Sequence, residues 1–171
     1  MKRAQLAINS VSTGGKGLEE RLAAYAAAGF THVEFALWHV KEYLQSHTPA
    51  DARALLDKHG LTCIGGFEGG LECFTPPAQR AQNHAQTLEN ARLLHALGGT
   101  NLVVGTDGPA DPKQGDPLGE MARVFAEVAQ QAEPLGDHPL HRVQLVAHCQ
   151  VPADGGGGGP PLRASQCGRL V

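Results

Sequence analysis

Several features of membrane, secreted and nucleic-acid-binding proteins are missing from this sequence. No stretch of about 18 consecutive apolar residues is present, and the N-terminus MKRAQLAINS lacks the apolar segment of a signal peptide. The net charge is -3, so the chain has no excess of basic residues to hold a phosphate backbone. We therefore expect a cytoplasmic protein that has neither a membrane nor nucleic acid as its partner.

Two short motifs are also missing. The four cysteines show no C-x-x-C spacing and are expected to be reduced thiols. The segment AINSVSTGGKG, after the first apolar run, does not match the G-x-G-x-x-G fingerprint, which argues against a dinucleotide-binding fold. His138, His141 and His148 cluster near Cys149, a grouping that could suggest a metal site if this part of the chain is translated in its native frame.

Strand and helix patterns alternate through residues 5–136. Short apolar runs predict strands at residues 5–10, 32–38, 61–67 and 101–105. Each is followed by a helical pattern that ends near a glycine. The helical patterns begin near Leu18, Thr48-Pro49, Thr75-Pro76 and Asp116-Pro117. The βαβαβαβα order with strongly apolar strands predicts a parallel sheet with helices packed outside it.

Two architectures fit this order. An open doubly wound sheet of about five strands would suit 171 residues. A (β/α)8 barrel needs about 250 residues, so four βα units would make only half of one.

Three segments carry a family resemblance. LEERLAAYAAAGFTHVEFALW, FEGG and LENARLLHALGGTNLVVGTDG resemble, in order and spacing, the xylose isomerase-like TIM barrels of the sugar phosphate isomerase/epimerase family, over residues 5–136. The resemblance implies an α/β fold, the N-terminal half (four βα units) of a TIM barrel, followed by an irregular or disordered tail. It also implies a divalent metal ion (Mn, Mg, Co or Zn) and proton transfer beside the carbonyl of a small sugar or sugar phosphate. Most metal ligands of the family come from the fifth to eighth strands.

Residues 137–171, which end VPADGGGGGPPLRASQCGRLV, do not look like a fifth βα unit. Glycine codons read one base later become Val, Ala, Glu or Gly codons. In that frame residues 142–146 can encode Glu-Phe-Asn-Trp-Trp, and the segment ending SQCGRLV can encode Ala-Asn-Val-Gly-Val-Leu. The two resemble the family's fifth strand, whose glutamate is a metal ligand, and its sixth. We hypothesise a frameshift near Gly136 or Asp137; the alternative is a flexible Gly/Pro tail.

Candidate substrate-binding residues are those at the carboxyl ends of the predicted strands, where barrels bind their ligands. Glu34 lies within an apolar strand, where an unpaired carboxylate is costly to bury. A tryptophan can cover a sugar face, and a histidine can bind a hydroxyl or phosphate. Glycines beside Glu68 allow close approach of a ligand to the backbone. The candidates are Asn9, Glu34, Trp38, His39 and Glu68; no metal ligand and no catalytic residue is assigned in this half.

We expect the intact gene product to be a metal-assisted sugar isomerase or epimerase, and an oligomer is compatible with it. The chain as translated lacks the fifth-strand glutamate, so we expect it to be inactive and to fold poorly alone, because half a barrel leaves an apolar face uncovered. The alternatives are a small non-enzymatic α/β binding module with a flexible tail and a metal-dependent endonuclease of the same barrel superfamily.

Overall fold

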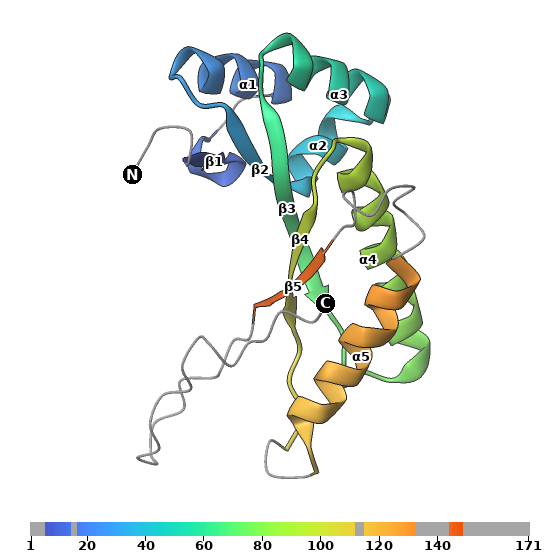
Figure 1. Ribbon diagram of the computed structural model, residues 1–171. Helices are drawn as coiled ribbons and strands as arrows, with labels where there is room; N and C mark the ends of the chain where they lie inside the picture. The colour runs from blue at the N-terminus through green and yellow to red at the C-terminus, as the bar shows by residue number, and fades with distance from the viewer. Residues whose placement is uncertain (1–5, 15–16, 112–114, 133–143, 149–171) are drawn as a thin grey trace, which may run out of the picture.

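The computed structural model describes residues 6–14, 17–111 and 115–132, together with the backbone of residues 144–148. Strands and helices alternate along these residues, as the apolar patterns predicted (Figure 1). The strands are β1 (Ala7–Asn9), β2 (His32–Ala36), β3 (Thr62–Leu71), β4 (Asn101–Thr106) and β5 (Gln144–His148). The helices are the 3-10 turn η2 (Ser10–Ser12) and α1 (Leu18–Ala27), α2 (Leu37–Tyr43), α3 (Pro49–Lys58), α4 (Pro77–Ala96) and α5 (Pro117–Ala132).

The order of the strands decides between the two predicted architectures. All neighbouring strands are parallel, and their order in the sheet is β1-β2-β3-β4-β5, the same as in the sequence. A doubly wound sheet reverses direction at a switch point, and this sheet has none. Right-handed crossovers in a sequential parallel sheet place all helices on one face. Figure 1 shows α4 and α5 side by side along the same side of the sheet. The arrangement is that of a TIM barrel opened along one side.

The hydrophobic core lies between the sheet and this helical layer. Alternate strand residues point into it, because successive side chains of a strand face opposite sides of the sheet. Val33, Phe35, Leu102 and Val104 are at most 1% exposed there. They pack with buried helix residues, among them Leu22, Leu56, Leu94 and Val124. Each large apolar side chain buried in this way contributes about 1.5–3 kcal/mol to stability.

The opposite face of the sheet has no helices among the described residues, and we call it the open face. Its side chains alternate with the core residues: Glu34 and Val103 are half-buried, and Ile64 is 36% exposed. In a closed barrel this face would line the interior and would be covered by the remaining strands.

Three of the four predicted helix starts are confirmed, and α1 begins at Leu18 as predicted. The Thr48 side chain accepts from the Asp51 backbone N–H while Asp51 accepts from the Thr48 backbone N–H, a capping box that begins α3 at Pro49. Asp116 accepts from the Gly119 N–H at 3.0 Å before α5. The third start lies later than predicted, because the Thr75 hydroxyl donates to Glu72 rather than capping α4.

Three strand predictions need correction. The second strand ends at Ala36, and Leu37 already begins α2, so Trp38 is helical. The third strand continues past residue 67 to Leu71, with an irregularity in its pairing between Phe67 and Gly70. Within the range predicted to be an irregular tail, Gln144–His148 forms β5, which pairs with β4 from Asn101 to Gly105. The free edge of β4 and the apolar sequence Leu-Val-Ala favour this pairing. The rest of the tail lies outside the described residues.

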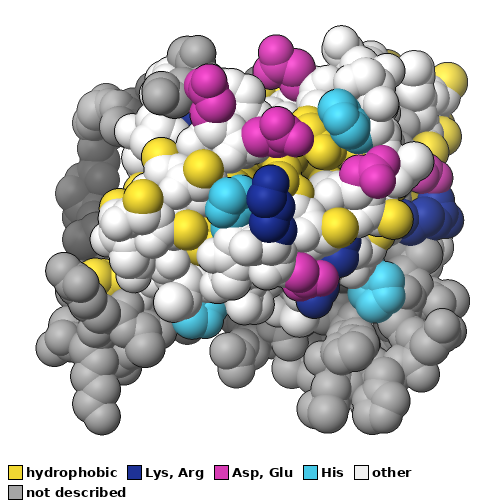
Figure 2. All heavy atoms as spheres, turned by 90° about the horizontal axis from the view of Figure 1, so that it is seen from above, with side chains coloured by type: hydrophobic (Ala, Val, Ile, Leu, Met, Phe, Trp, Pro, Cys, Tyr) yellow, Lys and Arg dark blue, Asp and Glu magenta, His cyan; other side chains and the backbone are white. Residues whose placement is uncertain are grey.

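The surface carries charges of both signs. Figure 2 shows the end of the molecule that bears α1 and α3, where acidic, basic and histidine side chains are interspersed with apolar ones. No helix in the described ranges combines the length and apolar character needed to cross a bilayer.

Candidate functional site

The carboxyl ends of β1 and β2 bring Asn9 and Glu34 together. The two residues are partners in the parallel pairing, so their side chains lie on the same face. The Asn9 Nδ2 donates a hydrogen bond to Glu34 Oε2 over 2.5 Å. Because Val33 and Phe35 point into the core, Glu34 points to the open face. The carboxylate therefore has an amide partner, and its second oxygen accepts no hydrogen bond within the described part of the chain.

Ser10 and His39 form a second pair beside the first. The fully buried Ser10 Oγ accepts a hydrogen bond from the Ala36 backbone N–H at 2.8 Å and lies 3.1 Å from His39 Nδ1. Burial first, and the Arg21 charge second, lower the pKa of His39 below its usual value of 6.5, although Glu42 opposes this. With the ring proton on Nε2, the neutral ring can accept the Ser10 hydroxyl proton at Nδ1.

Trp38 and Phe67 add an aromatic wall at the same end of the sheet. Their ring centroids are 5.2 Å apart at an interplanar angle of 89°, and the Trp38 ring also contacts His39 edge-on. Trp38 is 44% exposed, although it is large and apolar. An exposed tryptophan ring packed edge-on against His39 and Phe67 suits the apolar face of a sugar.

Arg21 of α1 supports the segment that follows β1. Its side chain is only 6% exposed. The guanidinium donates to the Ser10 carbonyl at 2.9 Å, to the Thr13 hydroxyl at 3.0 Å and to the Thr13 carbonyl. The Thr13 hydroxyl also lies 2.6 Å from the Tyr25 hydroxyl. This network fixes the position of Ser10, and through it that of His39.

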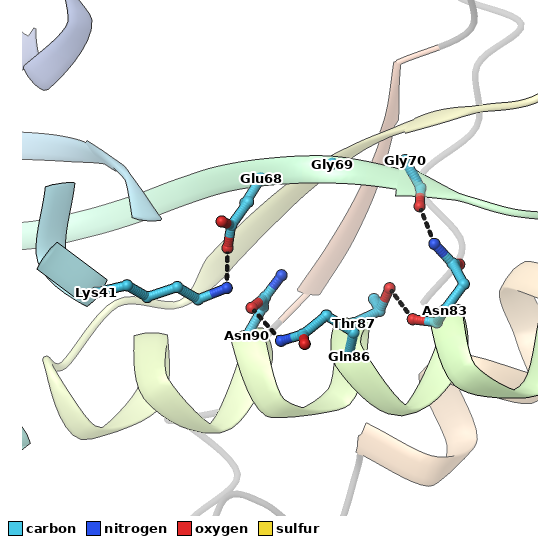
Figure 3. A pocket seen from close by; sticks show the side chains of 8 residues that line it. All are labelled: Lys41, Glu68, Gly69, Gly70, Asn83, Gln86, Thr87 and Asn90. Atoms are coloured by element: carbon cyan, nitrogen blue, oxygen red, sulfur yellow. Dashed lines mark hydrogen bonds and ion pairs between the residues drawn. The ribbon is translucent and has the colours of Figure 1, made fainter. Parts of the chain in front are cut away.

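The predicted candidate Glu68 is not part of this group. It lies two positions after Gly66, where an added Cβ would meet Leu37 and Leu94, so Glu68 faces the helical layer. There it forms an ion pair with Lys41 of α2 (Figure 3). The prediction placed Glu68 at the end of the third strand, but β3 continues to Leu71, and a position along a strand does not by itself identify the face.

The structure thus brings together four of the five predicted residues, namely Asn9, Glu34, Trp38 and His39. Ser10, Phe67 and Arg21 complete the group and were not among the predicted site residues. A signal for Arg21 was present, because it lies between Leu18 and Tyr25 on the buried stripe of its helix.

The described residues do not form a metal site. They contain no group of three or more His, Cys, Asp or Glu side chains that could hold an ion. Glu34 is bonded to an amide and Glu68 to an ammonium, neither of which is a metal ligand arrangement. Cys63 and Cys73 are free and buried, and burial raises the pKa of each thiol to about 12. The predicted histidine cluster near Cys149 lies outside the residues whose side chains are described.

Comparison with known proteins finds similarity in structure alone. No protein-family model matches the sequence, and no curated protein matches it. Among solved structures, a xylose isomerase-like TIM barrel/4-hydroxyphenylpyruvate dioxygenase fusion protein aligns over 84% of this chain and 21% of its own, with a TM-score of 0.67 and 21% identity. An IolI protein with a zinc atom aligns over 84% of this chain and 50% of its own, with a TM-score of 0.62 and 14% identity.

A D-psicose 3-epimerase solved in the presence of D-fructose is similar as well, with a TM-score of 0.57 and 18% identity over 81% of this chain. The chain spans 50% of that epimerase. At these identities the matches establish the fold alone, which is half of a TIM barrel, as the resemblance in the sequence implied.

Proposed function

We propose that this chain belongs to a lineage of sugar or sugar phosphate isomerases and epimerases and carries the substrate-binding wall of the N-terminal half barrel. The observation that carries the proposal is the Asn9–Glu34 pair beside Trp38 and His39 at the carboxyl ends of β1 and β2. Barrels of this class bind substrates at that end. The structural likeness to an epimerase solved with D-fructose supports a small ketose as the ligand.

Each residue has a role that its geometry supports. Glu34 accepts a hydrogen bond from a sugar hydroxyl through the oxygen that Asn9 does not engage. His39 donates through Nε2, since Ser10 occupies Nδ1. Trp38 covers the apolar face of the sugar ring or chain. We propose that these contacts bind and orient a sugar.

The chemistry of the proposed reaction would come from the other half of the barrel. A divalent metal held by that half would supply Lewis-acid polarisation of the substrate oxygens. The described residues contain no group of three or more His, Cys, Asp or Glu side chains that could hold such an ion, and we propose that later strands supply its ligands. We therefore propose that this chain binds a ketose weakly and does not isomerise it.

The sole tryptophan of the chain, Trp38, permits a direct test of sugar binding. D-fructose is titrated into the full chain while tryptophan emission is recorded, and we expect a saturable change. Glu34→Gln should weaken binding about tenfold, which corresponds to about 1.4 kcal/mol. Glu89→Gln on the outside of α4 removes the same charge from an exposed position and should leave the titration unchanged.

Activity is measured on the same samples with Mn²⁺ added, by chromatography of the ketose. We expect no product above the blank. A linear, unsaturable emission change that is the same in Glu34→Gln would reject the sugar-binding wall, and metal-dependent turnover by the chain would reject the claim that it is inactive. Saturable binding without turnover agrees with the proposal.

A further inference from the structure

A second polar cavity lies on the other side of the sheet from the Asn9–Glu34 pair. It occupies about 260 Å³ between β3 and α4, and its lining consists of Lys41, Glu68, two glycines of β3 and polar side chains of α4 (Figure 3). The cavity shares no lining residue with the candidate sugar site.

The inward face of α4 is polar where the cavity lies. Thr87 and Asn90 are each only 4% exposed, and one turn later the same face carries the buried apolar residues Ala91 and Leu94. A helix packed on a sheet normally presents apolar residues along its whole inner stripe. Burying an amide costs free energy unless a partner compensates it. Among the described residues the one buried side-chain nitrogen or oxygen without a hydrogen-bond partner is Arg80 Nε, so the polar start of this stripe borders space that water or another polar molecule can enter.

The hydrogen bonds of these side chains leave one donor group available. Thr87 donates to the Asn83 carbonyl at 3.1 Å, and Asn90 Oδ1 accepts from Gln86 Nε2 at 3.2 Å. Figure 3 shows the Asn90 amide nitrogen pointing into the cavity toward Glu68. That nitrogen makes no hydrogen bond among the described residues, and two N–H groups are free to bind a ligand oxygen.

Gly69 and Gly70 keep the cavity open on the strand side. Gly69 has a φ of 67°, a left-handed conformation that favours glycine, and no atom lies within 4 Å of where its Cβ would stand. The pairing irregularity of β3 falls at these residues. Bulges of this kind are common next to binding sites.

The charged groups that line the cavity determine which class of ligand it can bind. The Lys41 ammonium and the Glu68 carboxylate neutralise each other, and the other groups are amides and a hydroxyl. An anion would lie against Glu68, and a cation against Lys41. We propose that this cavity is a binding site for a small neutral polyol of about monosaccharide size, whose hydroxyls bond to Glu68 and Asn90. The proposal does not depend on the function proposed for the opposite face.

The test uses xylitol, a polyol without the carbonyl that an isomerase substrate needs, and backbone and side-chain amide NMR of the full chain. We expect saturable shifts of the Gly69, Gly70 and Asn90 amide signals. Asn90→Leu should weaken binding at least tenfold, and the near-isosteric Thr87→Val should also weaken it. Gln82→Leu, an amide-to-leucine change on the exposed side of the same helix, should not.

Sodium phosphate is titrated in parallel. Stronger shifts with phosphate than with xylitol would overturn the neutral-polyol assignment. The site itself is rejected by unsaturable shifts, by equal affinity in Asn90→Leu, or by a spectrum in which these residues have unfolded-chain shifts. Because Trp38 emission reports the opposite face, failure here leaves the sugar-binding result intact, and the reverse also holds.

Discussion

Replacement of Arg21 by methionine tests how the segment after β1 is held. Methionine keeps most of the aliphatic volume in this buried position but removes the guanidinium. The carbonyls of Ser10 and Thr13 and the Thr13 hydroxyl then lose a charged donor. Hydrogen bonds to charged groups contribute about 1.5–3 kcal/mol each. Because Thr13 is half-exposed and can be rehydrated, we expect a total loss of about 3 kcal/mol in the free energy of unfolding.

The same replacement should change the titration of His39. The Arg21 charge is the second cause of the lowered His39 pKa, after burial. Arg21→Met should therefore raise the pKa of His39 toward its usual value without restoring it fully. Arg21→Lys is the matched control, since it keeps the charge and loses the fork of donors. It should lower stability by about 1–2 kcal/mol while the His39 pKa stays low.

Urea unfolding gives the stabilities, and NMR titration of the His39 ring protons gives the pKa. The reasoning is refuted if Arg21→Met costs less than about 1 kcal/mol, because buried acceptors without a donor cost more than that. It is also refuted if the His39 pKa is equal in the wild-type chain and Arg21→Met.

Three further predictions concern pH, thiols and glycine. The folded state holds the pKa of His39 below 6.5, so the stability that this residue contributes is complete above that pH and is lost as the pH falls through the folded pKa. The urea midpoint should therefore drop more from pH 7.5 to 5.5 in the wild-type chain than in His39→Gln. Equal drops in the two chains would contradict this. The thiols of Cys63 and Cys73, with pKa values of about 12, should not be alkylated by iodoacetamide at pH 8 until urea unfolds the chain. Peptide mass spectrometry measures the alkylation, and labelling of the native chain would contradict the burial of these thiols. Gly66→Ala places a Cβ 2.9 Å from the Phe35 carbonyl oxygen and should destabilise the chain by about 1–3 kcal/mol in urea unfolding; an unchanged midpoint would argue against that close approach.

The alternation of strands and helices was predictable because it depends on local patterns. The capping box of Thr48 and the stripe of Leu18, Leu22 and Tyr25 mark helices without reference to the rest of the fold. The start of α2 was not predictable in this way, because HVEFALW reads as one continuous apolar strand. What ends β2 is the return of the chain into the helical layer, where Leu37 and Val40 are buried.

The sequence predicted the site residues by their positions at the ends of strands, and the structure shows on which face of the sheet each side chain lies. Asn9 and Glu34 share the open face because their strands are paired in register. Glu68 lies on the other face because β3 keeps its side-chain alternation through Gly66. Register and pleat are properties of strand pairing, so no pattern within a single strand contains them.

The fifth strand bears on the frameshift hypothesis. The translated residues Gln144–His148 pair with β4, and the shifted frame over residues 142–146 also reads as a strand, Glu-Phe-Asn-Trp-Trp. The translated frame thus already supplies a strand beside β4, and the frameshift stays a hypothesis. Only the shifted one adds a glutamate at its start, in the barrel region where the family resemblance implies a metal ligand.

The nucleotide sequence of the gene across the codons for residues 134–146 tests the half-barrel account most directly. We predict that the frame one base later contains a glutamate codon overlapping that of Arg142, followed by phenylalanine, asparagine and tryptophan codons, and stays open beyond the codon for Val171. A stop codon in that frame before Val171, or any other codon overlapping Arg142, would contradict the account.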